Sequence, residues 1–226
     1  MSEVVKKKPR VLLLYYSFSG QTSGVLHHLA LGLDSMGVEV VLERIHPVSS
    51  LRFPIGSVTR TVKMMLTTTL RCRVAIEPLS PLCFEDYNLI ILAGPTWSYN
   101  PSGPILSLFD RDGRRLFAER LVLPLISCRR YWRVHLWSLR QALRVCGARV
   151  VNRVVFTHPT PEPWVTIGVF MKLAGMNPEK SGFMRRFYKK YGHSRRQLDE
   201  AQAVGEKIGR ALRDGLSLAD LTLPPI

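Results

Sequence analysis

Residues 11–22, with the sequence VLLLYYSFSGQT, decide the fold. Their apolar first half ends in a hydroxyl-rich loop that leads directly into a helical pattern. Such an apolar run is typical of a buried parallel strand, and phosphate groups bind at the carboxyl ends of such strands. Gly20 permits close approach of the backbone, and the first amides of the helix carry a partial positive charge. The stretch predicts a phosphate site using the hydroxyls of Ser17, Ser19 and Thr22; an ordinary helix cap is the simpler alternative.

The rest of the chain alternates between strand and helix patterns. After the strand at 11–16, we expect strands at 38–42, 89–93, 121–127 and 149–157. We expect helices at 21–36, 105–117, 131–145 and 197–213. Strands separated by helices of this length predict a parallel sheet covered on both faces. Pro124 lies inside the fourth strand, where its missing N–H predicts a bulge or a local loss of pairing.

Two segments are longer than a simple crossover requires, residues 47–83 and 159–194. Both contain more apolar side chains than surface loops usually carry, including Met64 and Met65 in the first and Phe170 in the second. We therefore expect residues 1–226 to form a single domain. In it, both insertions act as lids over the carboxyl edge of the sheet and border an apolar pocket.

Length and composition narrow the class of protein. The chain has 226 residues and is 46% hydrophobic, which suits one α/β domain. Its four cysteines lack CxxC spacing, and no Asp, Glu or His group has metal-ligand spacing, so we expect reduced thiols and no metal. No apolar run approaches the ~18 residues of a membrane span, and the first residues lack a signal-peptide pattern. A cytoplasmic location is the resulting expectation.

The net charge of +15 predicts attraction to an anionic partner or ligand. Part of the charge lies in FMRRFYKKYGHSRR, residues 183–196, where aromatic residues separate the cations. A solvated face is the simplest interpretation. The alternatives are that Arg185 to Arg196 contact an anionic membrane surface, which would make the protein membrane-peripheral, or an acidic carrier protein. No motif predicts nucleic-acid binding, so we expect none.

Two further loops should meet the first one at the carboxyl edge of the sheet. GPTWSYNPSGP, residues 94–104, follows the third expected strand, and SCRRYWR, residues 127–133, follows the fourth. Trp97 and Tyr99 offer flat apolar faces, and polar neighbours can hydrogen-bond the edge of a heterocycle. A phosphate loop facing aromatic walls predicts a site for a planar, mononucleotide-like cofactor. The alternative is that these rings only pack beneath the insertions.

The first two loops resemble those of the flavodoxin family. SFSGQT, residues 17–22, is similar to its phosphate-binding loop, and GPTWSYNPSGP to its second flavin loop. The resemblance covers residues 10–157. It implies a doubly wound α/β fold with five parallel strands in the order 2-1-3-4-5, and FMN as cofactor. The cofactor-binding residues it implies are Ser17, Ser19, Gly20, Gln21, Thr22, Pro95, Thr96, Trp97, Ser98, Tyr99, Asn100, Ser127, Cys128 and Arg129.

Within that superfamily, the chain looks most like the flavodoxin-like dialkylresorcinol-condensing enzymes. The segments that carry this are ERIHPV (43–48) with Phe53-Pro54, SCRRYW (127–132) and GARVVNRVVFT (147–157). This subgroup implies a role beside a ketosynthase, as a flavin-dependent aromatase. The family's usual Asn after the first Arg of the third loop is Arg130 here.

The leading hypothesis is therefore an FMN-dependent oxidoreductase acting on a hydrophobic polyketide or acyl intermediate, free or carrier-bound. Tyr99, Arg129 and Tyr131 are candidates to steer substrate or protons. One alternative is a general NAD(P)H-dependent FMN or quinone reductase, and another is a non-catalytic partner subunit with this fold. The strongly basic charge opposes an electron-transfer flavodoxin. By analogy with other proteins of this fold, a homodimer is expected.

Overall fold

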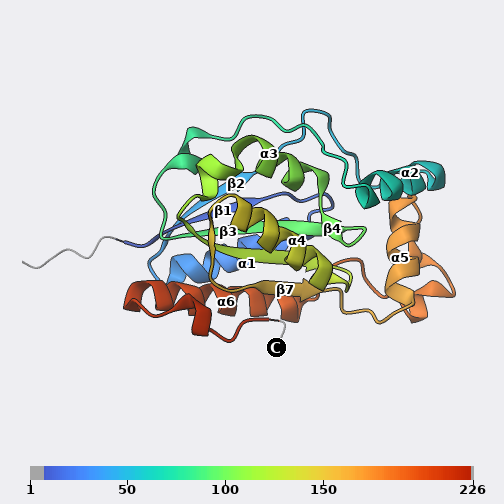
Figure 1. Ribbon diagram of the computed structural model, residues 1–226. Coiled ribbons are helices and arrows are strands. Elements are labelled where there is room, and N and C mark those ends of the chain that lie inside the picture. Colours follow the sequence, from blue (N-terminus) through green and yellow to red (C-terminus); the bar gives the residue numbers. More distant parts are fainter. Residues whose placement is uncertain (1–7, 225–226) are drawn as a thin grey trace, which may run out of the picture.

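The computed structural model describes residues 8–224, which form a parallel sheet between two layers of helices (Figure 1). The strands are β1 (Arg10–Tyr15), β2 (Glu39–Arg44), β3 (Leu89–Trp97), β4 (Asn100–Pro101), β5 (Leu121–Cys128), β6 (Arg149–Val150) and β7 (Val154–Thr157). The helices are α1 (Gln21–Ser35), α2 (Val58–Thr69), α3 (Gly103–Phe117), α4 (Trp132–Val145), α5 (Trp164–Leu173) and α6 (Arg195–Asp214). Four 3₁₀ turns are η1 (Pro81–Phe84), η2 (Pro178–Lys180), η3 (Met184–Arg186) and η4 (Leu218–Asp220).

The strand order confirms the predicted doubly wound fold. The sheet runs β2-β1-β3-β5-β6, with β7 also paired to β5, and these strands are parallel. The last expected strand is divided into β6 and β7, so counting them as one restores the order 2-1-3-4-5. The short β4 pairs antiparallel with the end of β3, which the sequence did not predict.

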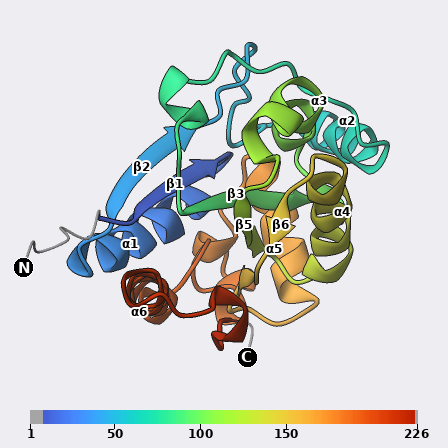
Figure 2. The ribbon, with the colours of Figure 1, turned by 60° about the vertical axis from the view of Figure 1, so that its left-hand side comes forward.

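Alternation along β1 explains why its sequence is apolar throughout. Leu13 and its alternate neighbours contribute to a core beneath α1 and α6, whereas Leu12 and Leu14 belong to the core beneath α3 and α4 (Figure 2). All three leucines are fully buried. A strand that is buried on both faces has no position that faces solvent. Its sequence is therefore a continuous apolar run and does not alternate between apolar and polar residues.

Pro124 marks the predicted interruption of pairing. It remains in register with Leu92 of β3. On the other side of β5, pairing passes from Val122–Val150 to Leu125–Val154, so the outer strand contains one extra residue. Because proline has no N–H to donate, a bulge at this position loses little.

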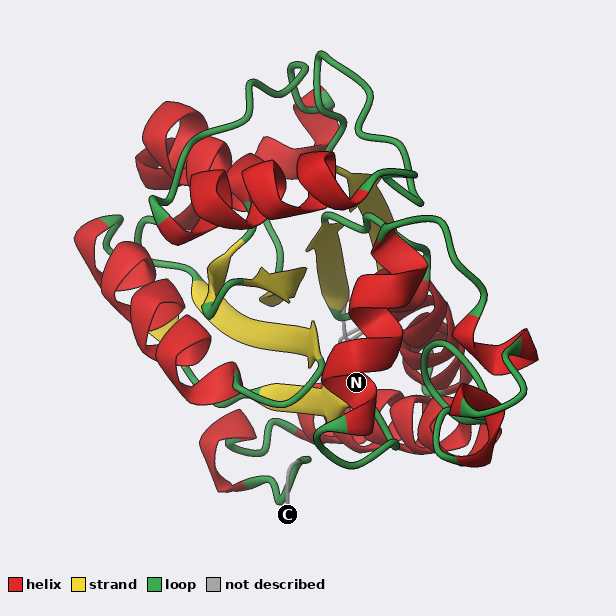
Figure 3. Ribbon diagram, turned by 90° about the vertical axis from the view of Figure 1, so that its right-hand side faces the viewer, coloured by secondary structure: helices red, strands yellow, loops and turns green. Residues whose placement is uncertain are grey.

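The two insertions meet beyond the carboxyl ends of the strands. The first contains α2 and η1, and the second contains α5, η2 and η3. The backbone amides of Ile55 and Gly56 both donate to the carbonyl of Leu173, at 2.9 and 3.1 Å. Figure 3 views this end directly, with helices in front of the strands. The placement supports the role of both segments as lids, which stays a prediction.

Within residues 8–224, no helix combines the length and apolar character needed to cross a bilayer.

Candidate functional site

A cavity of about 430 Å³ lies at the carboxyl end of the sheet. Its volume falls within the range of small-molecule sites, about 300–1,000 Å³. All three predicted loops contribute to its walls. The predicted residues that line it are Ser19, Gln21, Thr22, Pro95, Thr96, Trp97, Ser98, Tyr99, Ser127, Cys128, Arg129 and Tyr131. Ser17, Gly20 and Asn100 are not among the lining residues, and the local geometry explains each case.

The first loop opens α1 with exposed amide groups. Gly20 precedes the helix with φ 82°, a left-handed conformation that glycine adopts without strain. The N-cap position is therefore a glycine, and no Ser or Thr occupies it as the simpler interpretation expected. Ser17 is buried, and its Oγ accepts a hydrogen bond from the amide of Ser23 at 3.3 Å. Ser17 thus satisfies one amide of the first turn, and the helix start with a glycine N-cap is suited to an anion at the others.

A segment far along the chain, Tyr191 to His193, packs against this loop. The Tyr191 hydroxyl donates to Ser19 Oγ at 2.9 Å, and the His193 amide donates to Gln21 Oε1 at 3.0 Å. Gly192 has φ 97°, and a Cβ there would lie only 2.0 Å from Gln21 Oε1. Sequence analysis assigned this segment to a charged surface and missed its contact with the first loop.

The second loop is a tight hairpin between β3 and β4. Ser98 and Tyr99 form its turn with φ of 43° and 69°, which requires two non-glycine residues in the left-handed region. Helix α2 holds the turn: Thr68 Oγ1 lies 2.7 Å from Ser98 Oγ, which in turn approaches the Met65 carbonyl at 3.3 Å. Asn100 donates its side-chain amide to the Ser98 carbonyl at 3.1 Å. Its amide group therefore stabilises the loop.

Two buried histidines hold the loops from behind. Nδ1 of His135 on α4 lies 2.7 Å from Thr96 Oγ1, and Nε2 of His193 lies 2.8 Å from Ser127 Oγ. Burial lowers the pKa of His135 to about 3 and that of His193 to about 4, so both rings are neutral at pH 7. Nδ1 of His193 is buried without a hydrogen-bond partner among the described residues. The two rings therefore fix the Thr96 and Ser127 side chains at the wall of the cavity.

Two residues of the third loop differ in what they can contribute. Burial raises the pKa of the Cys128 thiol to about 12, so this group stays protonated and is a weak nucleophile at neutral pH. Arg129 donates to Thr166 Oγ1 at 3.0 Å, and its guanidinium lies 5.2 Å from the centre of the Phe170 ring. Arg129 thereby ties the loop to α5.

The two tyrosines proposed to steer substrate lie at the rim. Tyr99 and Tyr131 are each about half exposed, at 49% and 47%, and their rings meet edge to face at 5.3 Å. Arg130 does not line the main cavity. It borders a smaller neighbouring pocket together with both tyrosines.

The insertions supply the remaining walls. Sequence analysis named Met64, Met65 and Phe170 among their apolar residues but did not say which faces turn inward, because helical periodicity does not reveal this. The lining residues that it did not place in the site are Phe18, Met64, Met65, Thr68, Thr69, His158, Thr166, Val169, Phe170, Leu173, Tyr191, Gly192 and His193.

Comparison with known proteins identifies the fold. No protein-family model and no curated protein matches the sequence. Among solved structures, an FMN complex of a flavoprotein from Lactobacillus acidophilus NCFM is 21% identical, with a TM-score of 0.51 over 65% of this chain and 93% of that one. A WrbA-like flavodoxin from Agrobacterium tumefaciens is 14% identical, with a TM-score of 0.50 over 92% and 99%. The fold is flavodoxin-like.

A flavone reductase shares the same arrangement at 12% identity, with a TM-score of 0.51 over 94% of this chain and 66% of that one. At these identities the likeness concerns the fold. None of these three structures is described as acting on dialkylresorcinols, so that part of the resemblance stays a prediction.

Proposed function

We propose that this protein is an FMN-dependent oxidoreductase. The observation that carries the proposal is the convergence of all three predicted loops on one cavity, which begins at the start of α1, where the N-cap is Gly20. The fold that it shares with an FMN-bound flavoprotein supports the same cofactor. In open α/β sheets, ligands bind at this edge.

The groups around the first loop fit a phosphate. Helix amides and the hydroxyls of Ser19 and Thr22 are hydrogen-bond donors, and the hydroxyl of Tyr191 already points at Ser19. The helix N-terminus adds a favourable field for the negative charge. At the other end of the cavity, Trp97 and Tyr99 would contact the ring system of the flavin. When bound, FMN would supply the capacity to accept or donate a hydride.

The side chains from the insertions support a hydrophobic substrate. Met64 and Met65 from α2, and Phe170 and Leu173 from α5, line the cavity and would exclude water from the reacting atoms. We propose a polyketide- or acyl-derived intermediate, with the enzyme acting as a dehydrogenating aromatase in dialkylresorcinol-type biosynthesis, beside a ketosynthase or an acidic acyl carrier. Tyr99 and Tyr131, at the half-exposed rim, would steer toward solvent the proton released when a ring carbon loses hydride to the flavin.

A purified sample tests the cofactor directly. When FMN is titrated with the protein, we expect the fluorescence of the flavin to be quenched and its absorbance spectrum to shift. Ser19→Ala and Thr22→Val should each weaken FMN about tenfold, because each removes a hydrogen bond to a charged group. Ser35→Ala, at the other end of α1, is the matched control and should leave affinity unchanged. A wild-type protein that does not bind FMN would overturn the proposal and favour the non-catalytic partner subunit.

The main alternative is a general NAD(P)H-dependent FMN or quinone reductase, which the fold shared with a flavone reductase supports. Both proposed enzymes would use the same site, so only a comparison of their substrates can distinguish the two functions. Steady NADPH oxidation with simple quinones, together with no turnover of acyl-derived aromatic precursors, would favour this alternative. Turnover of the precursors without NADPH would exclude it.

A further inference from the structure

Helix α2 turns an apolar stripe toward solvent. Val58, Val62, Leu66 and Leu70 follow one another at intervals of four residues, which places them on one face of the helix, and each is between 50% and 76% exposed. The other side of the helix carries the buried Thr61 and Thr68 and the cavity-lining Met64. A helix of a globular protein normally turns its apolar stripe toward the core, so this exposed stripe needs a partner.

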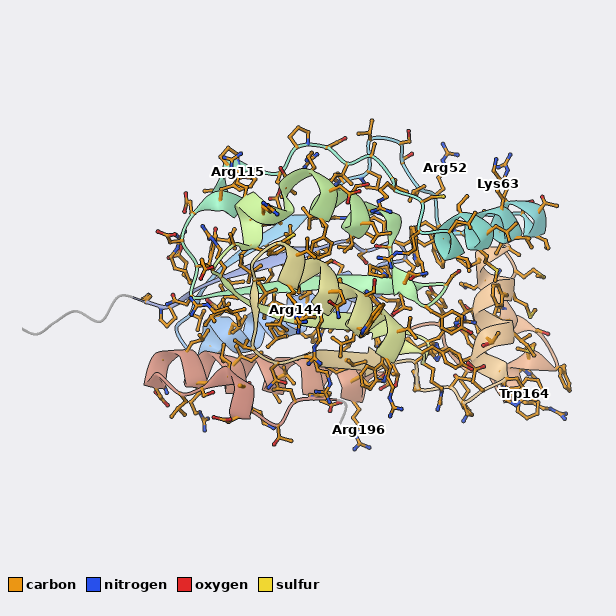
Figure 4. The ribbon with its side chains drawn as sticks, in the orientation of Figure 1. Arg52, Lys63, Arg115, Arg144, Trp164 and Arg196 are labelled. Carbon is orange, nitrogen blue, oxygen red and sulfur yellow. The ribbon has the colours of Figure 1, made fainter. Side chains whose placement is uncertain are left out.

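The second insertion exposes a separate group of aromatic and aliphatic side chains. Phe183 is 61% exposed, and Ile167, Met176 and Phe187 are also exposed. The Trp164 ring stacks on Phe187 at 4.0 Å with an angle of 8°. Stacked rings at the surface form a rigid apolar projection, and Trp164 lies at one end of α5 (Figure 4).

The charge around both apolar groups is predominantly positive. Between Glu43 and Glu77 the chain contains six Lys or Arg residues and no acidic residue. Residues 159–196 contain eight Lys or Arg and two Glu. Arg52 and Lys63 project from the α2 side in Figure 4. The charge and the apolar groups therefore suit an anionic surface with an apolar interior.

The two apolar groups belong to one end of the molecule. The backbone bonds from Ile55 and Gly56 to Leu173 join the insertions, and Figures 1 and 3 show α2 and α5 together beyond the sheet. We define the docking face as the exposed residues Val58, Val62, Leu66, Leu70, Ile167, Met176, Phe183 and Phe187 with the stacked Trp164 and the surrounding cations.

We propose that the docking face binds an anionic phospholipid membrane surface. Interfacial proteins insert Leu, Phe and Trp to the depth of the headgroups while Lys and Arg contact the anionic lipids. The docking face has this composition on the two insertions that also supply apolar walls of the cavity. A protein partner would need acidic patches placed to match cations on both insertions. An anionic lipid surface is uniformly charged, so it can contact all of these cations at once. The proposal concerns the surface and does not depend on the cofactor.

Vesicle flotation tests the proposal. The full chain is mixed with vesicles of phosphatidylcholine alone, or of phosphatidylcholine with an equal part of phosphatidylglycerol. We expect flotation with the anionic vesicles only, and weaker binding at high salt because screening shortens the reach of surface charges. Equal binding to both vesicle types, or no binding to either, would overturn the proposal.

Two variants locate the binding surface. Arg185→Gln/Arg186→Gln should lower the partition coefficient roughly 25-fold, since each cation near the surface contributes about fivefold. The matched control is Arg144→Gln/Arg210→Gln, which removes two exposed cations from α4 and α6. This variant and its control both keep the aromatic side chains of the docking face.

Val62→Ser/Leu66→Ser should lower the partition coefficient about tenfold by removing apolar contact. Its control is Leu31→Ser/Val145→Ser, at two exposed apolar positions away from the insertions. If variants and controls bind vesicles equally, the docking face is wrong. A concentration-dependent dimer in sedimentation, abolished by Val62→Ser/Leu66→Ser in a protein that does not float, would assign the stripe to a second copy instead.

Discussion

Three buried histidines should make the folded state sensitive to mild acid. Burial lowers the pKa of His135 to about 3, and that of His158 and His193 to about 4, against 6.5 for the free side chain. Since the folded-state pKa values lie below the unfolded ones, the unfolded chain binds more protons as pH falls. The stability contribution is complete above pH 6.5 and is lost as pH falls toward 4.

The size of the effect follows from these pKa values. One pKa unit corresponds to about 1.4 kcal/mol, so each histidine lowers the free energy of unfolding by about 2 kcal/mol between pH 7 and pH 5. Together the three remove about 6 kcal/mol, which is comparable to the whole stability of many domains, about 5–15 kcal/mol. We expect the urea midpoint to fall steeply below pH 6.5.

Urea unfolding at pH 7 and pH 5, followed by circular dichroism, measures the effect. His135→Asn removes one titrating group while its amide can replace the bond from Nδ1 to Thr96. The decrease in the free energy of unfolding from pH 7 to pH 5 should then be about 2 kcal/mol smaller than in the wild type. Ile90→Val changes a buried side chain that does not titrate. It should lower the free energy of unfolding by about 1 kcal/mol, equally at pH 7 and pH 5. If His135→Asn loses as much stability as the wild type, the reasoning is refuted.

Four further predictions concern glycines and thiols. Thermal unfolding should show that Gly24→Ala in α1 raises stability by about 1 kcal/mol, since nothing lies within 4 Å of the new Cβ. In α6, by contrast, Gly205→Ala should cost about 2 kcal/mol or more, because its Cβ would lie 2.1 Å from a backbone carbonyl of α1. Gly192→Ala should weaken FMN binding at least about fivefold in titration, because φ 97° strains alanine and its Cβ would displace the glutamine of the first loop. Mass spectrometry after iodoacetamide should find the exposed Cys72 modified well before Cys128, and the reverse order would contradict the protonated state assigned to that thiol.

Local patterns predicted the sheet and the three loops. The apolar run of β1 and the loop after it lie within twelve consecutive residues, so neighbouring side chains carry the signal. The hairpin at Ser98–Tyr99 was missed, because such turns are usually marked by Asn-Gly or Asp-Gly, and this one has two positive φ values without them.

Contacts over long distances in sequence could not be predicted. Tyr191 and Ser19 are 172 residues apart, and His193 lies 66 residues from Ser127. Their meeting depends on the path of the second insertion, which has no repeat or motif to indicate its course. The stripe on α2 illustrates a related limit. Its periodicity is plain in the sequence, but only tertiary packing decides whether that face is buried or exposed.

The second insertion links the docking face to the first loop, so binding at the two should be coupled. Phe187 belongs to the docking face, and Tyr191, four residues later, contacts Ser19. Between them, Tyr188 is fully buried and its ring stacks on His158 with 5.3 Å between ring centres. This packing fixes the backbone between Phe187 and Tyr191, so a shift at one residue is transmitted to the other. If vesicles shift Phe187, Tyr191 should move with it and change FMN affinity. Linkage then requires FMN to change vesicle affinity by the same factor. FMN titrations with and without anionic vesicles, and flotation with and without FMN, measure both factors. Unequal factors would mean that the two measurements do not report one binding equilibrium, and a factor of one in both would show that the insertion carries no coupling.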